Sequence, residues 1–165
     1  LRSLQNGAVH AAVNHFGEYG QNIYSHHKKV WDITYAELVK LLPTDEAKAT
    51  TKGKIDNFAA AYGTILFFED HNVVKGLQEQ FPSYADNFPI WSEQSTGIAS
   101  FAVWNALAEA GVGANIQHYN PLIDEKVAKE WNIPSNLVLR AQMPFGEIVG
   151  EAAPIERKAR VRVVK

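Results

Sequence analysis

The longest helical pattern in this chain runs from Ser92 to Ala110, and its apolar residues leave no side of the helix suited to water. A helix of this kind is typically buried all round, so we interpret it as a subunit contact. Gly111 and Gly113 end the pattern. The polar cluster that follows directly consists of Asn115, Gln117, His118 and Tyr119. The pattern therefore predicts an interface with a ligand-facing loop at the end of the helix.

Shorter helical patterns occur on both sides of this one. The segments that they cover are Tyr35–Leu42, Thr51–Tyr62, Asn72–Gln80 and Pro121–Trp131. In the last of these, Asn120 is the expected N-cap and Pro121 the first helical residue. We also expect helix at His10–Ala12.

Strand patterns are fewer. Thr64–Phe68 is a continuous apolar run of strand length, which predicts a central buried strand, and Val138–Met143 predicts a second. Arg160–Val164 alternates charged and apolar residues, as an edge strand does. Long helices around a few strands indicate a single α+β domain over residues 1–165.

Composition narrows the possible functions. The net charge of −2 gives no field that would attract nucleic acid or an anionic membrane surface. The absence of cysteine excludes disulfides and cysteine-based metal sites. Because no 18-residue apolar run and no signal-peptide pattern is present, we expect a soluble cytoplasmic protein.

The titratable residues do not indicate a catalytic or metal site. We interpret His26 and His27 as a surface pair and expect His71 to cap the helix after it. Glu69 and Asp70 have the positions of charges at the end of a strand. No nucleophile motif, phosphate-binding loop or dinucleotide fingerprint is present. The residues alone therefore indicate an α+β domain with an interface, and no particular reaction.

Four segments in unbroken order resemble a known family. They are Lys54–Asp70, Phe88–Ser95, Gly113–Ile123 and Ala141–Gly146. The most specific motifs are Ser-Glu-Gln-Ser in the second segment and Gln-His-Tyr-Asn-Pro-Leu-Ile in the third. From Val30 onward the chain resembles the nitroreductase family of FMN-dependent oxidoreductases, in its branch of short bacterial and fungal members.

The resemblance implies a nitroreductase-like fold, with a central mixed or antiparallel sheet flanked by helices, in an intertwined homodimer. Each of two FMN sites is then built from both chains. The implied phosphate ligands are Arg2 and Ser3, together with Arg160 or Arg162. The other residues with an implied place in the cofactor site are Asn14, Lys54, Trp91, Ser92, Glu93, Ala114, Asn115, Gln117, His118 and Tyr119.

The same resemblance implies a place for several of these residues around the flavin. Lys54 approaches the N1/O2 edge, where reduction deposits negative charge. The Ala114–Tyr119 loop lies against the ring near N5, with Gln117 and His118 as its polar contacts. The segment from Trp91 to Glu93 reaches the ring or the substrate from the other subunit.

The N-terminal part departs from the family pattern. His10–Ala12 resembles the start of the Pro-Ser-Ser-Phe-Asn-Ser-Gln segment of family members, but Val13–Gly17 replaces what should follow, and the chain is shorter than they usually are. Because the rest of the framework is intact, we expect that the sequence is incomplete or uncertain there rather than that a flavin-contacting loop has been lost.

The function implied by the resemblance is reduction of nitroaromatics or quinones by NADH or NADPH, in a ping-pong mechanism with FMN as cofactor. Because the flavin performs the chemistry, no side chain is expected to be catalytic. Two alternatives remain open: a catalytically weak flavin-binding sensor or regulatory dimer, and a redox-inert dimeric module of the lipid- or stress-signalling kind. The sequence separates neither NADH from NADPH nor one acceptor from another.

Overall fold

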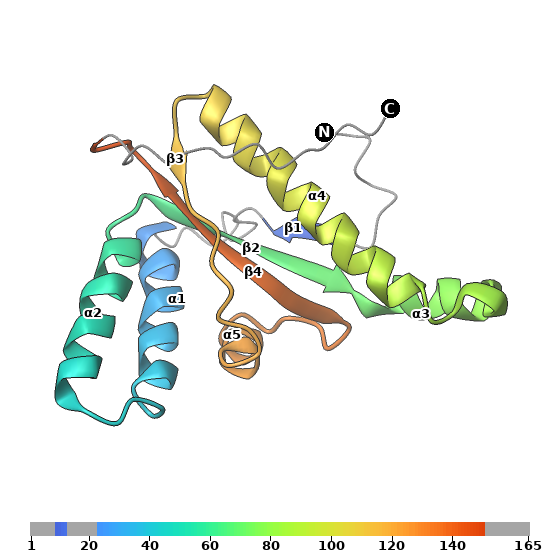
Figure 1. Ribbon diagram of the computed structural model, residues 1–165, viewed down its shortest axis with the longest axis horizontal. Coiled ribbons are helices and arrows are strands. Elements are labelled where there is room, and N and C mark those ends of the chain that lie inside the picture. The colour runs from blue at the N-terminus through green and yellow to red at the C-terminus, as the bar shows by residue number, and fades with distance from the viewer. Residues whose placement is uncertain (1–8, 13–22, 151–165) are drawn as a thin grey trace, which may run out of the picture.

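The computed structural model describes residues 9–12 and 23–150 of the chain (Figure 1). The strands are β1 (Val9–Ala12), β2 (Gly63–Asp70), β3 (Gly113–Ala114) and β4 (Leu137–Gly146). The helices are α1 (Ile23–Leu38), α2 (Asp45–Ala59), α3 (His71–Gln80), the 3-10 helix η3 (Pro82–Tyr84), α4 (Phe88–Glu109) and α5 (Asp124–Glu130). Helices and strands are not arranged in alternating βαβ units, and the predicted α+β class is confirmed.

The described strands form one antiparallel sheet in the order β1-β2-β4-β3. Its centre is the long ribbon of β2 and β4, paired from Gly63 opposite Phe145 to Asp70 opposite Leu137. The predictions of strands at Thr64–Phe68 and Val138–Met143 are therefore confirmed, and β2 is an internal strand as expected. The predicted strand at Arg160–Val164 lies outside the described residues.

Helices cover the two faces of this sheet, α4 on one and α1, α2 and α5 on the other (Figure 1). Successive β2 residues point to opposite faces, as the pleat requires. Leu66 and Phe68 pack with Val30 of α1 and Val127 of α5. The alternate β2 residues Ile65 and Phe67 pack beneath Val103 and Leu107 of α4, with Ala141 and Met143 of β4. Burial on both faces explains why β2 is a continuous apolar run.

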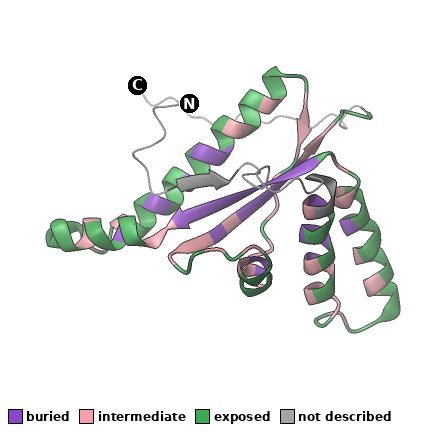
Figure 2. Ribbon diagram, turned by 180° about the vertical axis from the view of Figure 1, so that it is seen from behind, coloured by how far each residue is buried: buried purple, intermediate pink, exposed green. Residues whose placement is uncertain are grey.

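The helix α4 is distinctive because its small and hydroxyl-bearing residues face inward. Its buried residues are Ser92, Thr96, Ala99 and Ser100. Much of the rest of the helix is exposed (Figure 2). Its exposed large side chains include Ile98 at 67%, Phe101 at 64% and Trp104 at 38%. Because nothing in the described residues covers these side chains, the predicted burial on every side would require a second subunit, and it stays a prediction.

Several predicted boundaries are also wrong. The helix expected at Tyr35–Leu42 is the end of a longer one, α1, and the one expected at Thr51–Tyr62 begins earlier, at Asp45. Thr44 sets that start, because its hydroxyl accepts a hydrogen bond from the Ala47 N–H at 3.2 Å. His10–Ala12 belongs to β1 and is paired with β2, so it is strand and not helix.

Capping differs from expectation in two further places. The helix predicted at Pro121–Trp131 begins at Asp124, and Asn120 does not cap it, since its side-chain amide donates to the Leu139 carbonyl at 2.7 Å. His71 is the first residue of α3 and not its cap. That role belongs to Asp70, whose carboxylate accepts from the Asn72 N–H at 2.9 Å.

His27 is buried, so the interpretation of His26 and His27 as a surface pair is wrong for His27. Its Nε2 lies 3.1 Å from the Ala59 carbonyl, which can only accept, so Nε2 carries the proton. Nδ1 then accepts from the Thr64 hydroxyl at 2.8 Å, and that oxygen in turn accepts from Trp31 Nε1 at 3.0 Å. These bonds join α1 to β2 and to the end of α2.

The described ranges, 9–12 and 23–150, contain neither a membrane-spanning helix nor a metal-binding cluster. No helix there is long and apolar enough to cross a membrane. No group of three or more His, Asp or Glu side chains within the same ranges could hold a metal ion.

Candidate functional site

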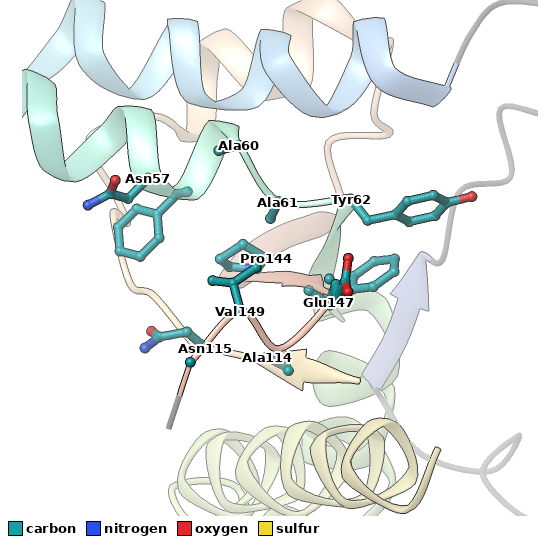
Figure 3. A pocket seen from close by; sticks show the side chains of 14 residues that line it. Asn57, Ala60, Ala61, Tyr62, Ala114, Asn115, Pro144, Glu147 and Val149 are labelled. Atoms are coloured by element: carbon teal, nitrogen blue, oxygen red, sulfur yellow. The ribbon is translucent and has the colours of Figure 1, made fainter. Parts of the chain in front are cut away.

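A cavity of about 840 Å³ lies where α2 ends, β2 begins and β4 ends (Figure 3). Its size falls within the range of about 300–1,000 Å³ that is usual for small-molecule and cofactor sites. The wall is formed by the last turn of α2, by β3 and by the end of β4 with the residues after it. The lining residues are Asn57, Phe58, Ala60, Ala61, Tyr62, Gly113, Ala114, Asn115, Pro144, Phe145, Gly146, Glu147, Val149 and Gly150.

Close backbone packing builds one wall of this cavity. The Tyr62 N–H donates to the Phe145 carbonyl at 2.9 Å, and the two rings lie 6.0 Å apart. A Cβ atom added to Gly63 would lie only 2.7 Å from the Phe145 ring. Glycine at this position therefore allows the aromatic ring to lie directly against the start of β2.

The loop after β3 is attached to β4 by main-chain bonds. The Asn115 N–H donates to the Pro144 carbonyl at 3.1 Å, and Gln117 exchanges two bonds with Gln142, at 2.7 and 2.9 Å. The side-chain amide of Gln117 donates to the side-chain oxygen of Asn115 and to the main-chain carbonyl of Ile116. The Gln117 side chain is therefore turned toward Asn115, which lines the cavity.

The rest of this loop lies away from the cavity lining. His118 is exposed, and its Nδ1 donates to the Arg140 carbonyl at 3.1 Å. The Tyr119 ring packs edge-on against Trp31 with centroids 6.1 Å apart, which places it in the core beside α1. Among the predicted loop contacts, Ala114 and Asn115 line the cavity, whereas Gln117, His118 and Tyr119 do not.

A second cavity, of about 370 Å³, lies at the opposite end of the β2–β4 ribbon, between α3 and the start of α4. Glu69 is its most buried charged residue, with 1% of its surface exposed. The carboxylate accepts from Arg140 Nε at 2.9 Å and from His71 Nε2 at 3.0 Å. Arg140 also contacts the exposed Glu93 of α4 at 2.8 Å. The sequence suggested that Glu69 is a simple charge at the end of a strand. The structure shows instead a buried carboxylate that is paired with Arg140 and His71.

The ionisation of Glu69 is set by opposing effects. Burial disfavours the charged carboxylate, but the Ser92 hydroxyl and the Arg140 guanidinium beside it outweigh this, so the pKa of Glu69 is lowered. The carboxylate is thus ionised and paired at neutral pH. Because Glu93 belongs to α4, the charged cluster of Glu69, His71, Arg140 and Glu93 attaches the start of that helix to the sheet.

The remaining predicted site residues are distributed over the molecule. Lys54 lies one turn before Asn57 on α2, with its ammonium 5.8 Å from the centre of the Phe58 ring, so it is close to the large cavity. Trp91 is exposed on α4, where it contacts the rings of Tyr84 and Phe88. Within one chain, Ser92 and Glu93 lie at the charged cluster and not at the large cavity. The residues that lie outside the described ranges are Arg2, Ser3, Asn14, Arg160 and Arg162.

The lining of the large cavity suits the ring system of FMN. Phe58, Tyr62 and Phe145 supply aromatic surface, and the side-chain amides of Asn57 and Asn115 supply donors and acceptors. The lining contains no Lys or Arg among the described residues, so a phosphate would need cations from elsewhere. The aromatic surface and the two amides together therefore suit a flat, largely apolar heterocycle with polar edges.

Comparisons of this sequence with a family model and with curated proteins agree with one another. Residues 8–147 match the model of the Nitroreductase family. Two Saccharomyces cerevisiae proteins, nitroreductase FRM2 and putative nitroreductase HBN1, are each 35% identical to this chain, over 131 and 136 residues. These alignments cover 79% and 82% of this chain but only 62% and 64% of the two relatives.

Solved structures are similar as well. Nitroreductase CinD from Lactococcus lactis, in complex with chloramphenicol, is 46% identical with a TM-score of 0.77, and the match covers 99% of this chain and 79% of that one. The same protein in complex with 4-nitrophenol has a TM-score of 0.75. A nitroreductase from Saccharomyces cerevisiae is 29% identical with a TM-score of 0.67, covering 88% of this chain and 76% of that one.

Proposed function

The chain belongs to the nitroreductase family, and on that premise we propose that it is an FMN-dependent oxidoreductase that reduces nitroaromatics or quinones with NADH or NADPH in a ping-pong mechanism. The observation that carries the proposal is the large cavity, whose aromatic surface and two amide side chains match the needs of a flavin ring. The Ala114–Asn115 segment that the family resemblance assigns to the flavin also lines this cavity.

The proposed roles of the chain's own residues follow from this position. Phe58, Tyr62 and Phe145 exclude water from the ring, and Asn57 and Asn115 bind its polar edges. Lys54 offers a positive charge near the cavity. Arg2, Ser3 and Arg160 or Arg162 are proposed to bind the phosphate, which the described lining leaves without a cation. When bound, FMN supplies the hydride chemistry, so the protein needs no acid–base dyad.

A homodimer is part of the proposal. The exposed Ile98, Phe101 and Trp104 recur at three-residue spacing on α4 and offer an apolar surface that a second copy would bury. Contiguous exposed apolar surface of this kind is unusual on a monomer and typical of an interface. We expect an obligate interface that buries upward of about 2,000 Å² in total. In such a dimer, the partner's start of α4 would supply Trp91, Ser92 and Glu93 to the site.

The proposed acceptors are supported by the relatives. CinD has been solved in complex with chloramphenicol and with 4-nitrophenol, and each of these compounds carries a nitro group on an aromatic ring. A cavity with three aromatic side chains is suited to flat acceptors of this type, because aromatic rings stack favourably on one another.

A spectroscopic experiment tests the proposal. The purified protein is incubated with FMN, freed of unbound cofactor, and its flavin spectrum is followed on addition of NADH or NADPH and then of 4-nitrophenol or a quinone. We expect bound flavin that is bleached by the reductant and restored by the acceptor. Bound flavin without turnover would favour the sensor or regulatory dimer, and a protein that retains no flavin would overturn the proposal.

A further inference from the structure

Gln142 is a fully buried polar residue in the middle of β4, with 0% of its surface exposed. It lies opposite Leu66 in the sheet register, on the face covered by α1 and α5. A buried amide is costly unless its donor and acceptor are both satisfied. Here the oxygen accepts from the Tyr119 N–H at 2.9 Å, and the nitrogen donates to the Asn120 side-chain oxygen at 3.0 Å. Both partners belong to the loop after β3.

Asn120 extends this connection. Its amide nitrogen donates to the Leu139 carbonyl at 2.7 Å and to the Asp124 carboxylate at 2.8 Å. The end of the loop is thus fixed to β4 and to the first residue of α5. Each of these contacts depends on the Asn120 side chain being held in one orientation, which the bond from Gln142 provides.

The other end of the same loop reaches the large cavity. Gln142 bonds the Gln117 main chain in both directions, and the Gln117 side chain holds that of Asn115, which lines the cavity. Gln142 itself does not line the cavity. One buried residue therefore contacts the loop at three places. Its side-chain amide bonds Tyr119 and Asn120, and its main chain bonds Gln117, which lies two residues before Tyr119 and whose side chain holds that of Asn115.

We propose that Gln142 is a positioning residue, whose side-chain amide fixes the Asn115–Asn120 loop and thereby sets both the affinity for FMN and the rate of its reduction. The inference rests on the proposed function. A residue that only stabilised the fold would change the free energy of unfolding and leave both flavin properties unaltered. Misplacement of binding groups by about 1 Å is enough to change a rate on the order of a hundredfold.

The first test compares Gln142→Met with Thr34→Val. Both substitutions keep the volume of a fully buried side chain and remove its polar group, but Thr34 lies on α1 and donates only to the Val30 carbonyl. We expect Gln142→Met to weaken FMN binding about tenfold, the effect of roughly 1.4 kcal/mol, and to slow flavin reduction on the order of a hundredfold. For Thr34→Val we expect parent-like flavin properties.

Gln142→Glu serves as a second variant in case Gln142→Met does not fold. A protonated carboxyl can still accept from Tyr119 and donate to Asn120, whereas a carboxylate cannot donate. Burial raises the pKa of a carboxyl at this position. We therefore expect the reduction rate of Gln142→Glu, divided by that of the parent at the same pH, to rise toward one as the pH falls.

The outcomes separate this inference from the proposed function. A parent protein that binds no FMN overturns both. A parent that binds FMN, with Gln142→Met or Gln142→Glu matching its affinity and reduction rate at every pH, overturns only the positioning role. Equal losses of flavin affinity in Gln142→Met and Thr34→Val would likewise assign Gln142 to the stability of the fold alone.

Discussion

The two faces of the sheet are covered in opposite ways. On one face, α1 directs large apolar side chains inward, with Val30 and Trp31 both buried in the core. On the other face, α4 directs serine, threonine and alanine inward along its first half and packs Val103 and Leu107 on the core. It leaves Phe101 and Trp104 exposed. The side chains that α1 directs inward are buried within one chain, whereas α4 exposes large apolar side chains on the side away from its own sheet. The difference teaches that the overall hydrophobicity of a helix does not reveal which of its sides packs against its own sheet.

The largest expected effect comes from Trp31 on the face covered by α1. Trp31 is fully buried, stacks on Phe58 with ring centres 4.9 Å apart and donates to Thr64. Trp31→Ala leaves a large void and removes one of the two side-chain hydrogen bonds of Thr64, so we expect a loss of about 3–5 kcal/mol in the free energy of unfolding. Urea denaturation at several protein concentrations is the measurement.

The matched control for that measurement is Trp104→Ala on α4. In that variant we expect stability to become less dependent on protein concentration, because the lost contact is with a partner and a weaker dimer adds less stability at each concentration. If Trp104→Ala were as damaging as Trp31→Ala at every concentration, the contrast between the two faces would be refuted.

The second effect concerns assembly. Phe101→Glu places a charge in the middle of the exposed apolar surface of α4, and burying it against a second copy would cost about 2–4 kcal/mol, as loss of an interface hot spot does. We expect sedimentation velocity at micromolar concentration to show the dimer for the parent and the monomer for the variant. Val73→Glu, which adds the same charge at an exposed position of α3, is the control and should leave the dimer intact. A parent that sediments as a monomer would contradict the proposal that this surface of α4 is a dimer interface.

The third effect is a difference in stability between variants of two carboxylates, Glu69 and Glu93, which both contact Arg140. Glu69 is buried and Glu93 is exposed. Glu69→Gln removes a buried charge from a paired guanidinium, and we expect a loss of about 1.5–3 kcal/mol in unfolding free energy. Glu93→Gln, at the exposed partner, should cost about 0–1 kcal/mol because water screens that pair. Equal losses in urea denaturation would show that burial does not set the strength of these bonds.

Parts of this architecture could be predicted from the sequence because the signal was local. The apolar run of β2 identified an internal strand, and the glycines after α4 located the loop at the cavity. The start of α1 was missed because His27, a polar residue, is one of its buried positions. Gln142 was missed for another reason. Its side-chain partners lie 22 and 23 residues earlier in the chain, and no spacing in the sequence indicates such a contact.

The smallest expected effect is the pH dependence of the face covered by α1, through His27. Burial lowers the pKa of His27 from its ordinary value of 6.5, the bond to the Ala59 carbonyl opposes this, and the charge of Lys28 lowers it further. The unfolded chain therefore binds a proton at a higher pH than the folded protein does. As the pH falls from 7.5 through about 6.5, stability is lost, and the loss stops below the folded-state pKa.

Burial of the charged ring is the main physical reason for the loss. In addition, a charged His27 ring would present a second N–H to the Thr64 hydroxyl, which already accepts from Trp31. Urea midpoints measured between pH 7.5 and 5 should fall for the parent and change less for His27→Gln, whose amide can still donate to the Ala59 carbonyl. Lys28→Gln is the graded control. Removing its charge moves the folded-state pKa of His27 back toward its ordinary value, so the fall should be smaller than in the parent. An identical fall in the parent and His27→Gln would assign the acid sensitivity to other groups.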